Sequence, residues 1–552
     1  MSRYVSPTWY KDAVFYQIYV RAYRDGNGDG HGDFKGLLTK LDYLQQLGVD
    51  CIWIMPMYPS PLVDDGYDVS DFYNIHEDYG DLEDFQAVID GIHQRGMKVI
   101  VDIVVNHTSD QHPWFIESRS SKTNPKRDWY VWSDTDQRYR EARIIFLDTE
   151  TSNWTFDPIT GEYYWHRFYS QQPDLNYDNP EVQQEMLNII DFWMEKGIDG
   201  FRVDAVPYLF EREGTNCENL PETHAYIRRI REHVDAKWPG RILLAEANQW
   251  PEDVREYFGT DDAPEFHMAF HFPIMPRLYL ALKQCTRRSI VDILNRTPPI
   301  PRDAQWCIFL RNHDELTLEM VTEEERQFMW EHYAPDPRMR LNLGIRRRLA
   351  PLLDNDQRRI RMLNALLFTL PGSPIIYYGD EIGMGDDIWR DDRNGVRTPM
   401  QWDFTKNGGF SDADELYEPV LTDDVYGYHK LNVVQQQADP ESLWYTMRHM
   451  LSVRRNYRAF GRGSFEFALP ENEAILGYWR TYSSDEDGAE VNERFLILAN
   501  LTDSEQTGTL DLSEFVGCEP VDVLTGYPWT PVEEKPYQFS LPPYGYYWLR
   551  FK

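Results

Sequence analysis

Along most of the chain, apolar residues occur in short continuous runs, each followed by a longer amphipathic stretch. Continuous runs of this length are typical of strands buried on both faces of a parallel sheet. Apolar residues three and four positions apart, as in the intervening stretches, are typical of helices that cover such a sheet. The predicted strands are 14–19, 51–55, 98–105, 200–203, 242–245, 266–272, 308–310 and 375–378, and the clearest helices are 34–47, 82–95, 181–195 and 358–368.

Eight buried strands joined by helices predict an α/β fold, a closed parallel (β/α)8 barrel of the TIM type. We assign residues 1–106 and 179–460 to this barrel, with a charged insertion at about 315–356. Residues 107–178, after the third strand, are too many for a connecting loop and predict an inserted lid domain. From 461 to 552, apolar and polar residues alternate between glycines and prolines, which predicts a C-terminal antiparallel β-sandwich.

The chain of 552 residues has 91 acidic and 56 basic side chains, a formal net charge of −35. This charge disfavours nucleic acid and membrane surfaces as partners and favours a neutral or cationic small molecule. The five cysteines are scattered and odd in number, which predicts a reducing compartment. No signal-peptide pattern or membrane-length apolar run occurs, so we expect a cytoplasmic protein. The oligomeric state stays open, a homo-oligomer included.

Three predicted strands end in or lead directly to an acid, namely Asp204, Glu246 and Asp314. Arg202 lies two positions before Asp204, so both side chains point to the same face of their strand. Such a pair can be a structural ion pair and nothing more. Two carboxylates at neighbouring strand ends are, however, what glycosyl transfer with retention requires, one as nucleophile and one as proton donor. We therefore predict glycosidic chemistry, with the third acid binding sugar hydroxyls.

A family resemblance supports this prediction. The four segments that carry it are 102–107, 200–204, the strand that leads to Glu246, and 309–314. In order and separation they resemble the four characteristic segments of the α-amylase superfamily, glycoside hydrolase family 13. The resemblance implies that Asp204 is the nucleophile, Glu246 the general acid/base and Asp314 the stabiliser of the transition state. It also implies sugar contacts by Arg202, His107 and His313.

The segment Gln172-Pro-Asp-Leu-Asn176 resembles the α-glucosidase branch of that superfamily, which acts on a terminal glucose. This resemblance implies a pocket closed at its far end by Asp64 and Arg397. Asp65 and Asp68 lie close to Asp64 in the sequence and compete for its role. The further pocket residues that the resemblance implies are Tyr67, Phe168 and Gln172.

Residues 139–157, 204–224 and 245–250 resemble the disaccharide-isomerising members of that branch. The resemblance implies that maltose and trehalose are interconverted by a retaining double displacement, through a covalent β-glucosyl ester of Asp204, with minor hydrolysis to glucose. Three enzymatic alternatives stay open: an exo-acting α-glucosidase, an oligo-1,6-glucosidase and a sucrose isomerase-like enzyme. A binding protein without activity is disfavoured because all three acids are present.

Charged residues in the two insertions predict a gate over the sugar. Arg143 lies in the lid stretch, and Glu315 and Glu319 lie after the seventh predicted strand. We predict that the two insertions close against each other and keep water away from the ester, while Asn248 hydrogen-bonds the glucose as it turns. Such charges can also belong to an ordinary solvated surface.

Two structural calcium sites are predicted, of which the one in residues 25–33 could also take magnesium, and no organic cofactor is expected. One prediction comes from spacing, because oxygen ligands alternate with glycines as in a calcium loop. Its residues are Asp25, Asn27, Asp29, His31 and Asp33. The alternative is a turn rich in Gly and Asp. The other site is implied by the family resemblance and would hold the lid to the barrel through Asn106, Asp174, Tyr208, Leu209 and Glu211.

Overall fold

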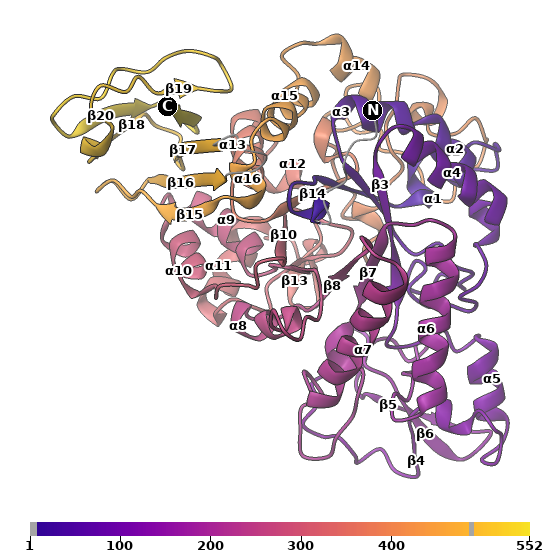
Figure 1. Cartoon of the computed structure of the whole chain (residues 1–552). Helices are drawn as coiled ribbons and strands as arrows, with labels where there is room; N and C mark the ends of the chain where they lie inside the picture. The colour runs from indigo at the N-terminus through magenta and orange to yellow at the C-terminus, as the bar shows by residue number, and fades with distance from the viewer. Residues whose placement is uncertain (1–7, 485–490) are drawn as a thin grey trace.

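The computed structural model describes residues 8–484 and 491–552. Eight parallel strands close into a barrel in the order β1-β14-β10-β9-β8-β7-β3-β2 (Figure 1). The strands are β1 (Phe15–Ile18), β2 (Cys51–Ile54), β3 (Lys98–Val104), β7 (Gly200–Asp204), β8 (Ile242–Ala245), β9 (Met268–Phe270), β10 (Gln305–Phe309) and β14 (Ser373–Tyr377). Almost every residue in them is buried, as continuous apolar runs predict. The predicted parallel barrel is confirmed.

Helices follow the barrel strands and cover the outside of the sheet (Figure 1). They are α1 (Val20–Tyr23), α2 (Phe34–Thr39), α3 (Leu41–Leu47), α4 (Leu82–Gln94), α6 (Pro180–Glu195), α7 (Pro221–Lys237), α8 (Pro251–Val254), α9 (Ile274–Gln284), α10 (Arg288–Arg296), α13 (Gln357–Leu367), α14 (Val433–Ala438), α15 (Leu443–Arg455) and α16 (Ala459–Arg462). The predicted helix 34–47 is two helices, because the backbone leaves helical geometry at Lys40 (φ −107°, ψ 2°). No helix in the described part of the chain is both long and apolar enough to cross a membrane.

Between β3 and β7 the chain leaves the barrel and builds a small three-stranded sheet (Figure 1). This part contains α5 (Pro113–Ser120), β4 (Trp132–Ser133), β5 (Trp154–Asp157) and β6 (Glu162–Trp165). A bridge between His107 and Asp174 joins the start and the end of this excursion. After β10 a second excursion forms β11 (Leu316–Thr317), α11 (Glu323–Tyr333), β12 (Arg340–Leu341), β13 (Gly344–Ile345) and α12 (Leu349–Leu352). The domain boundaries given from the sequence stay predictions.

The C-terminal part is antiparallel and forms a five-stranded and a two-stranded sheet. Its strands are β15 (Ser464–Phe467), β16 (Ile475–Ser484), β17 (Val491–Asn500), β18 (Gln506–Leu510), β19 (Val521–Asp522), β20 (Tyr537–Leu541) and β21 (Tyr546–Phe551). A second apolar core, which includes Leu496, Leu498, Phe539 and Leu541, joins strands of the two sheets. The predicted antiparallel C-terminal domain is thus confirmed, and it lies away from the excursion that carries β4 to β6 (Figure 1).

Candidate active site

Arg202 binds three carboxylates at the carboxyl end of the barrel. Its Nη1 lies 2.5 Å from Asp102 Oδ1 and 2.6 Å from Asp204 Oδ1, and its Nη2 lies 2.5 Å from Glu246 Oε1. The register pairs Asp102 with Arg202 across β3 and β7, which sets the first of these contacts. Arg202 is only 1% exposed, so its charge is little screened by water. One guanidinium therefore holds the predicted nucleophile and the predicted acid side by side.

The three carboxylates around Arg202 share a single positive charge. Burial raises the pKa of Asp204 well above its usual value; Arg202 opposes the rise, and Glu246 and Asp102 add to it. Burial, again opposed by Arg202, raises the pKa of Asp102 to about 7. The Arg202 guanidinium holds the carboxyls of Asp204 and Glu246 on its two terminal nitrogens. Two carboxyls held by one guanidinium fit the short spacing of retaining enzymes better than the wider spacing of inverting ones.

Asp314 is held as an anion by three basic groups. His313 Nε2 lies 3.0 Å from its Oδ2, and Arg393 Nε and Arg397 Nη2 lie 3.0 Å and 3.1 Å from its Oδ1. Burial would raise the pKa of Asp314, but these neighbours outweigh burial and keep it well below its usual range. A carboxylate that stays charged can accept hydrogen bonds from sugar hydroxyls at any working pH.

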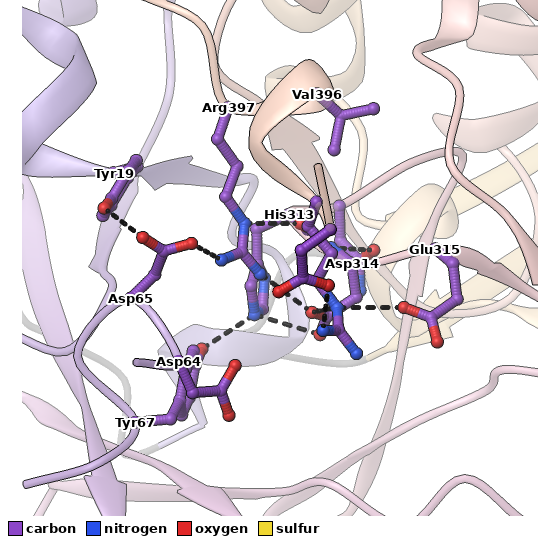
Figure 2. Close-up of polar contacts among 12 residues, drawn as sticks. Tyr19, Asp64, Asp65, Tyr67, His313, Asp314, Glu315, Val396 and Arg397 are labelled. Atoms are coloured by element: carbon purple, nitrogen blue, oxygen red, sulfur yellow. Dashed lines mark hydrogen bonds and ion pairs between the residues drawn. The ribbon is translucent and has the colours of Figure 1, made fainter. Parts of the chain in front are cut away.

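Tyr67 and His313 form a stacked pair beside this carboxylate (Figure 2). Their ring centroids are 5.4 Å apart with the planes 12° from parallel, and the Tyr67 hydroxyl lies 2.8 Å from His313 Nε2. Gln17, on β1, lies 2.6 Å from the other ring nitrogen. Burial lowers the pKa of His313, although Asp314 opposes this. The stack gives the site a flat, rigid wall.

His107 and Phe168 form the opposite aromatic part of the site. Their rings are 5.1 Å apart, and burial lowers the pKa of His107 to about 3, so the imidazole is neutral. Phe146, from the lid excursion, packs on Phe168 at 5.5 Å. The lid therefore contributes directly to the wall around the sugar position.

Asp64 and Asp65 point in opposite directions (Figure 2). Asp64 accepts a hydrogen bond of 2.9 Å from Gln172 Nε2 and lines the cavity. Asp65 instead binds Arg397 Nη1 and accepts a bond of 3.1 Å from the Tyr19 hydroxyl. Arg397, expected to close the pocket with Asp64, thus pairs with Asp65 and Asp314 behind the wall, and it is Arg393 that lines the cavity.

The cavity between these groups is small, about 90 Å³. Ligand pockets usually measure about 300–1,000 Å³, so this cavity is closed too tightly to admit a disaccharide from solution. Its lining residues are Asp64, Tyr67, His107, Phe146, Phe168, Asp204, Glu246, Asp314 and Arg393. A movement of the surrounding loops must therefore accompany substrate binding.

The two insertions meet over this cavity. Arg143 of the lid excursion binds Glu319 of the second excursion at 2.5 Å and Glu218 of the loop after β7 at 2.9 Å. The Asn342 backbone N–H donates to Asp148 Oδ2 at 2.7 Å, which is a second link between the excursions. Arg143 and Glu319, which face each other across the two insertions, are therefore paired, while 37% of the Arg143 side chain stays accessible to water.

Glu315 and Asn248 lie beside this contact. Glu315 accepts a bond of 3.0 Å from Arg393 Nε and a bond of 3.2 Å from Asn342 Nδ2. Asn248 Nδ2 donates to Thr317 Oγ1 at 3.1 Å, while the buried Oδ1 of Asn248 has no hydrogen-bond partner. An oxygen of this kind is free to accept a bond from a sugar hydroxyl.

Three buried oxygens without a hydrogen-bond partner lie on the residues of the predicted lid-to-barrel cation site. They are Asn106 Oδ1, Asp174 Oδ2 and Glu211 Oε1. Burial raises the pKa of Asp174 to about 8, and burial together with Asp174 raises that of Glu211 well above its usual value. Buried oxygens that lack protein donors fit a hard cation. In the described part of the chain, no three His, Cys, Asp or Glu side chains form a metal cluster, so an amide and backbone carbonyls have to complete the set.

The loop 25–33 is different, because its carboxylates are already bound by the protein. Asp25 accepts bonds from the backbone of Asn27, Gly28 and Gly30, and Asp33 accepts from Gly36. Asn27 and Asp29 side chains accept from the backbone of Asp29 and His31, as in successive Asx turns. None of these described side chains has a buried oxygen without a partner. The turn alternative accounts for this loop without a cation.

Sequence reasoning did not identify Arg393, Phe146 or Glu218 as site residues. Arg393 lies in an irregular loop after β14, and Phe146 and Glu218 lie in loops with no periodic pattern. The run Asp391-Asp392-Arg393-Asn394-Gly395 was a weak signal, since a basic residue among acids after a barrel strand is a candidate for an ion pair at the site.

The chain matches the model of the alpha amylase catalytic domain over residues 17–333 and 345–463, and that of the maltogenic amylase C-terminal domain over residues 465–548. It therefore belongs to the α-amylase family of glycosidic enzymes.

Within the family, the chain is 56% identical to the trehalose synthase/amylase TreS of Mycobacterium tuberculosis, over 99% of this chain and 90% of that protein. It is 54% identical to the trehalose synthase of Pimelobacter sp., over 99% and 96%. Among solved structures, the trehalulose synthase MutB of Pseudomonas mesoacidophila MX-45 is 28% identical with a TM-score of 0.78, over 99% of both chains. The resemblance predicted from sequence is confirmed, while the roles of single residues stay predictions.

Proposed function

We propose that this protein interconverts maltose and trehalose by intramolecular transfer of a glucosyl group. The observation that carries the proposal is the Arg202 cluster, in which one guanidinium holds both Asp204 and Glu246 at the wall of a small cavity. The 54–56% identity to trehalose synthases supports the choice of substrates.

The proposed reaction has two inverting steps. Glu246 donates a proton to the bridge oxygen of maltose, and Asp204 attacks the anomeric carbon to form a β-glucosyl ester. The freed glucose turns and presents its own anomeric hydroxyl, Glu246 removes that proton, and the ester is displaced to leave an α,α-1,1 bond. Asp314 accepts hydrogen bonds from the reacting ring, most strongly as charge develops on it.

Exclusion of water favours transfer over hydrolysis. The cavity of about 90 Å³ and the Arg143–Glu319 ion pair above it support the proposed gate. We further propose that Asn248 Oδ1 accepts a bond from the turning glucose, because it is buried and has no protein partner. A small fraction of free glucose is expected whenever the gate opens before transfer.

We propose a structural calcium ion at Asn106, Asp174 and Glu211, with the carbonyls of Tyr208 and Leu209. A bound ion would supply the positive charge that two buried carboxylates lack and would fix the lid to the barrel. Calcium or magnesium in the loop 25–33 remains a prediction, to be judged against the turn alternative by titration with either ion. Neither site takes part in bond cleavage.

The direct test is to incubate the purified protein with maltose alone and to separate the sugars by chromatography. Trehalose as the main product, and maltose as the main product from trehalose, is the expected result. Glucose as the main product would favour an α-glucosidase. The same assay with sucrose tests the isomerase alternative, since a structure of MutB contains its substrate sucrose.

A cytoplasmic location remains a prediction. All five cysteines are unpaired, two of them outside the buried core at positions 285 and 518, which is the pattern expected in a reducing compartment.

A further inference from the structure

Trp389 is unusually exposed for a tryptophan. It lies in the loop that follows β14, and 72% of its surface is accessible to water. An exposed indole offers a flat apolar face on which a ligand ring can stack. The proposed transfer at Asp204 does not use this residue.

The indole of Trp389 is held firmly from one side. The Arg338 guanidinium lies over the ring, 3.4 Å from its centroid. Asp336 fixes that guanidinium through a 3.0 Å bond from Nε and a second contact from Nη2. The Trp389 backbone N–H donates to Asp387 Oδ1 at 3.0 Å. The ring is thus preorganised, and one face is already covered.

A cleft of about 440 Å³ lies beside Trp389. Arg338 is not among its lining residues, so the cleft does not lie on the covered face of the indole. The volume is in the range of ligand pockets and is about five times that of the cavity at Asp204. The cleft is therefore large enough for more than one sugar ring without any movement.

Planar polar groups line the cleft next to the indole. Arg390 Nε lies 3.1 Å from Asp387 Oδ2, and Arg390 Nη1 lies 3.0 Å from Glu418 Oε2. Arg390 and Asp387 are 32% and 26% exposed, so they can still bond a ligand. An apolar ring face beside a carboxylate and a guanidinium suits a pyranose, whose C–H face stacks on the indole while its hydroxyls bond the charged groups. The net charge of −35 disfavours an anionic ligand.

We propose that the Trp389 cleft is a second saccharide-binding site, separate from the catalytic cavity, which takes a linear chain of α-linked glucose units. The assignment of α-linked glucose rests on the proposed function, whereas the existence of a saccharide site does not. The same loop carries Arg393, which lines the catalytic cavity, four residues later.

The test is native electrophoresis of the full chain in gels that contain soluble starch, with Asp204→Asn in every variant to prevent digestion. We expect starch to retard the parent, and Trp389→Ala to weaken this binding at least five-fold. Tyr527→Ala is the matched control, because Tyr527 is 73% exposed and lies in the C-terminal domain. Arg338→Ala keeps the indole but frees its covered face, and we expect intermediate binding.

An unretarded parent, or equal retardation of the parent and Trp389→Ala, would overturn the inference. Equal retardation by laminarin, a β-linked glucan, would overturn the assignment of α-linked glucose. Folding is checked by the thermal midpoint, which removal of an exposed side chain should barely change. A negative result in the starch-gel experiment would not change the result of the maltose assay. The second site and the proposed function are therefore judged separately.

Discussion

At the scale of single residues, the chemistry depends on how one buried arginine divides its charge among three carboxylates. Arg202 contacts Asp102, Asp204 and Glu246 at 2.5–2.6 Å, so the pKa values of Asp102 and Asp204 depend on their neighbouring carboxyls. Glu246 has the more exposed carboxyl, with 19% of its side chain accessible against 10% for Asp204. This difference fits a proton donor that faces the leaving group and a nucleophile that faces the ring.

The two carboxyls should respond differently to a substrate that needs no acid. On maltose, we expect both Glu246→Gln and Asp204→Asn to lose at least about 10³-fold in kcat/KM. On α-glucosyl fluoride, fluoride leaves without a proton, so Glu246→Gln should keep most of the rate of its first turnover, seen as a burst of fluoride. Its later turnovers, which need Glu246 as a base, should slow, while Asp204→Asn remains inactive. A fluoride electrode measures this directly. The opposite pattern would exchange the two roles.

Asp102 makes stability depend on pH in a definite direction. Its pKa of about 7 lies above the value of about 3.9 in an unfolded chain, so the folded protein binds more protons between these values. The free energy of unfolding should therefore fall as pH rises through this window, and Asp102 alone should contribute about 2 kcal/mol of that fall between pH 5 and 7. Asp102→Asn cannot titrate, and its fall should be smaller by this amount. Urea unfolding of both proteins at the two pH values tests it, and identical pH dependence would contradict it.

The sequence predicts some residues of the site and not others, for physical reasons. Asp204, Glu246 and Asp314 were predictable because barrel geometry brings the ends of parallel strands together. The different directions of Asp64 and Asp65 could not be predicted. They depend on a left-handed backbone conformation at Asp65 (φ 46°), which no periodic sequence pattern indicates.

At the scale of elements, the two excursions add side chains to a site that is formed by the barrel strands. The lid excursion supplies Phe146 and Arg143, and the second excursion supplies Glu319 and Asn342. The sequence predicted where each excursion begins because the strand and helix pattern stops there. It did not predict Arg393 as a contact, since that residue follows β14 in an irregular loop whose path depends on tertiary packing.

Removal of the gate residue should shift the products. Arg143→Ala breaks the ion pairs with Glu319 and Glu218, so water should reach the ester more often. We expect the ratio of free glucose to trehalose to rise several-fold, as measured by chromatography after incubation with maltose. Arg140→Ala is the matched control, because Arg140 is exposed and, among the described residues, its side chain bonds to Gln137 of the same segment. An unchanged ratio in Arg143→Ala would argue against the gate.

The proposed calcium site makes thermal stability depend on the ion. Calcium should raise the thermal midpoint by about 5 °C over that in EDTA, since it neutralises the buried pair of Asp174 and Glu211. Glu211→Gln should largely remove this response. Glu213→Gln, on an exposed side chain two residues later, should keep it. If EDTA and calcium gave the same midpoint in the unaltered protein, the site would be rejected.

At the scale of the whole molecule, different parts of the chain contribute differently to the site. The barrel aligns the carboxyls, and the excursions close the cavity. Continuous apolar runs were enough to predict the barrel, and alternation was enough to predict the antiparallel C-terminal domain. The opposite charges of the two excursions led to the hypothesis that they meet over the cavity. The Arg143–Glu319 contact supports this hypothesis.

The most direct test of the account is to incubate the protein with unlabelled maltose in the presence of excess 13C-labelled glucose and to analyse the trehalose by mass spectrometry. Because the freed glucose turns inside a closed cavity, the account predicts trehalose almost without label. Trehalose labelled in proportion to the free glucose pool would mean that the first glucose leaves before transfer, and would contradict the account.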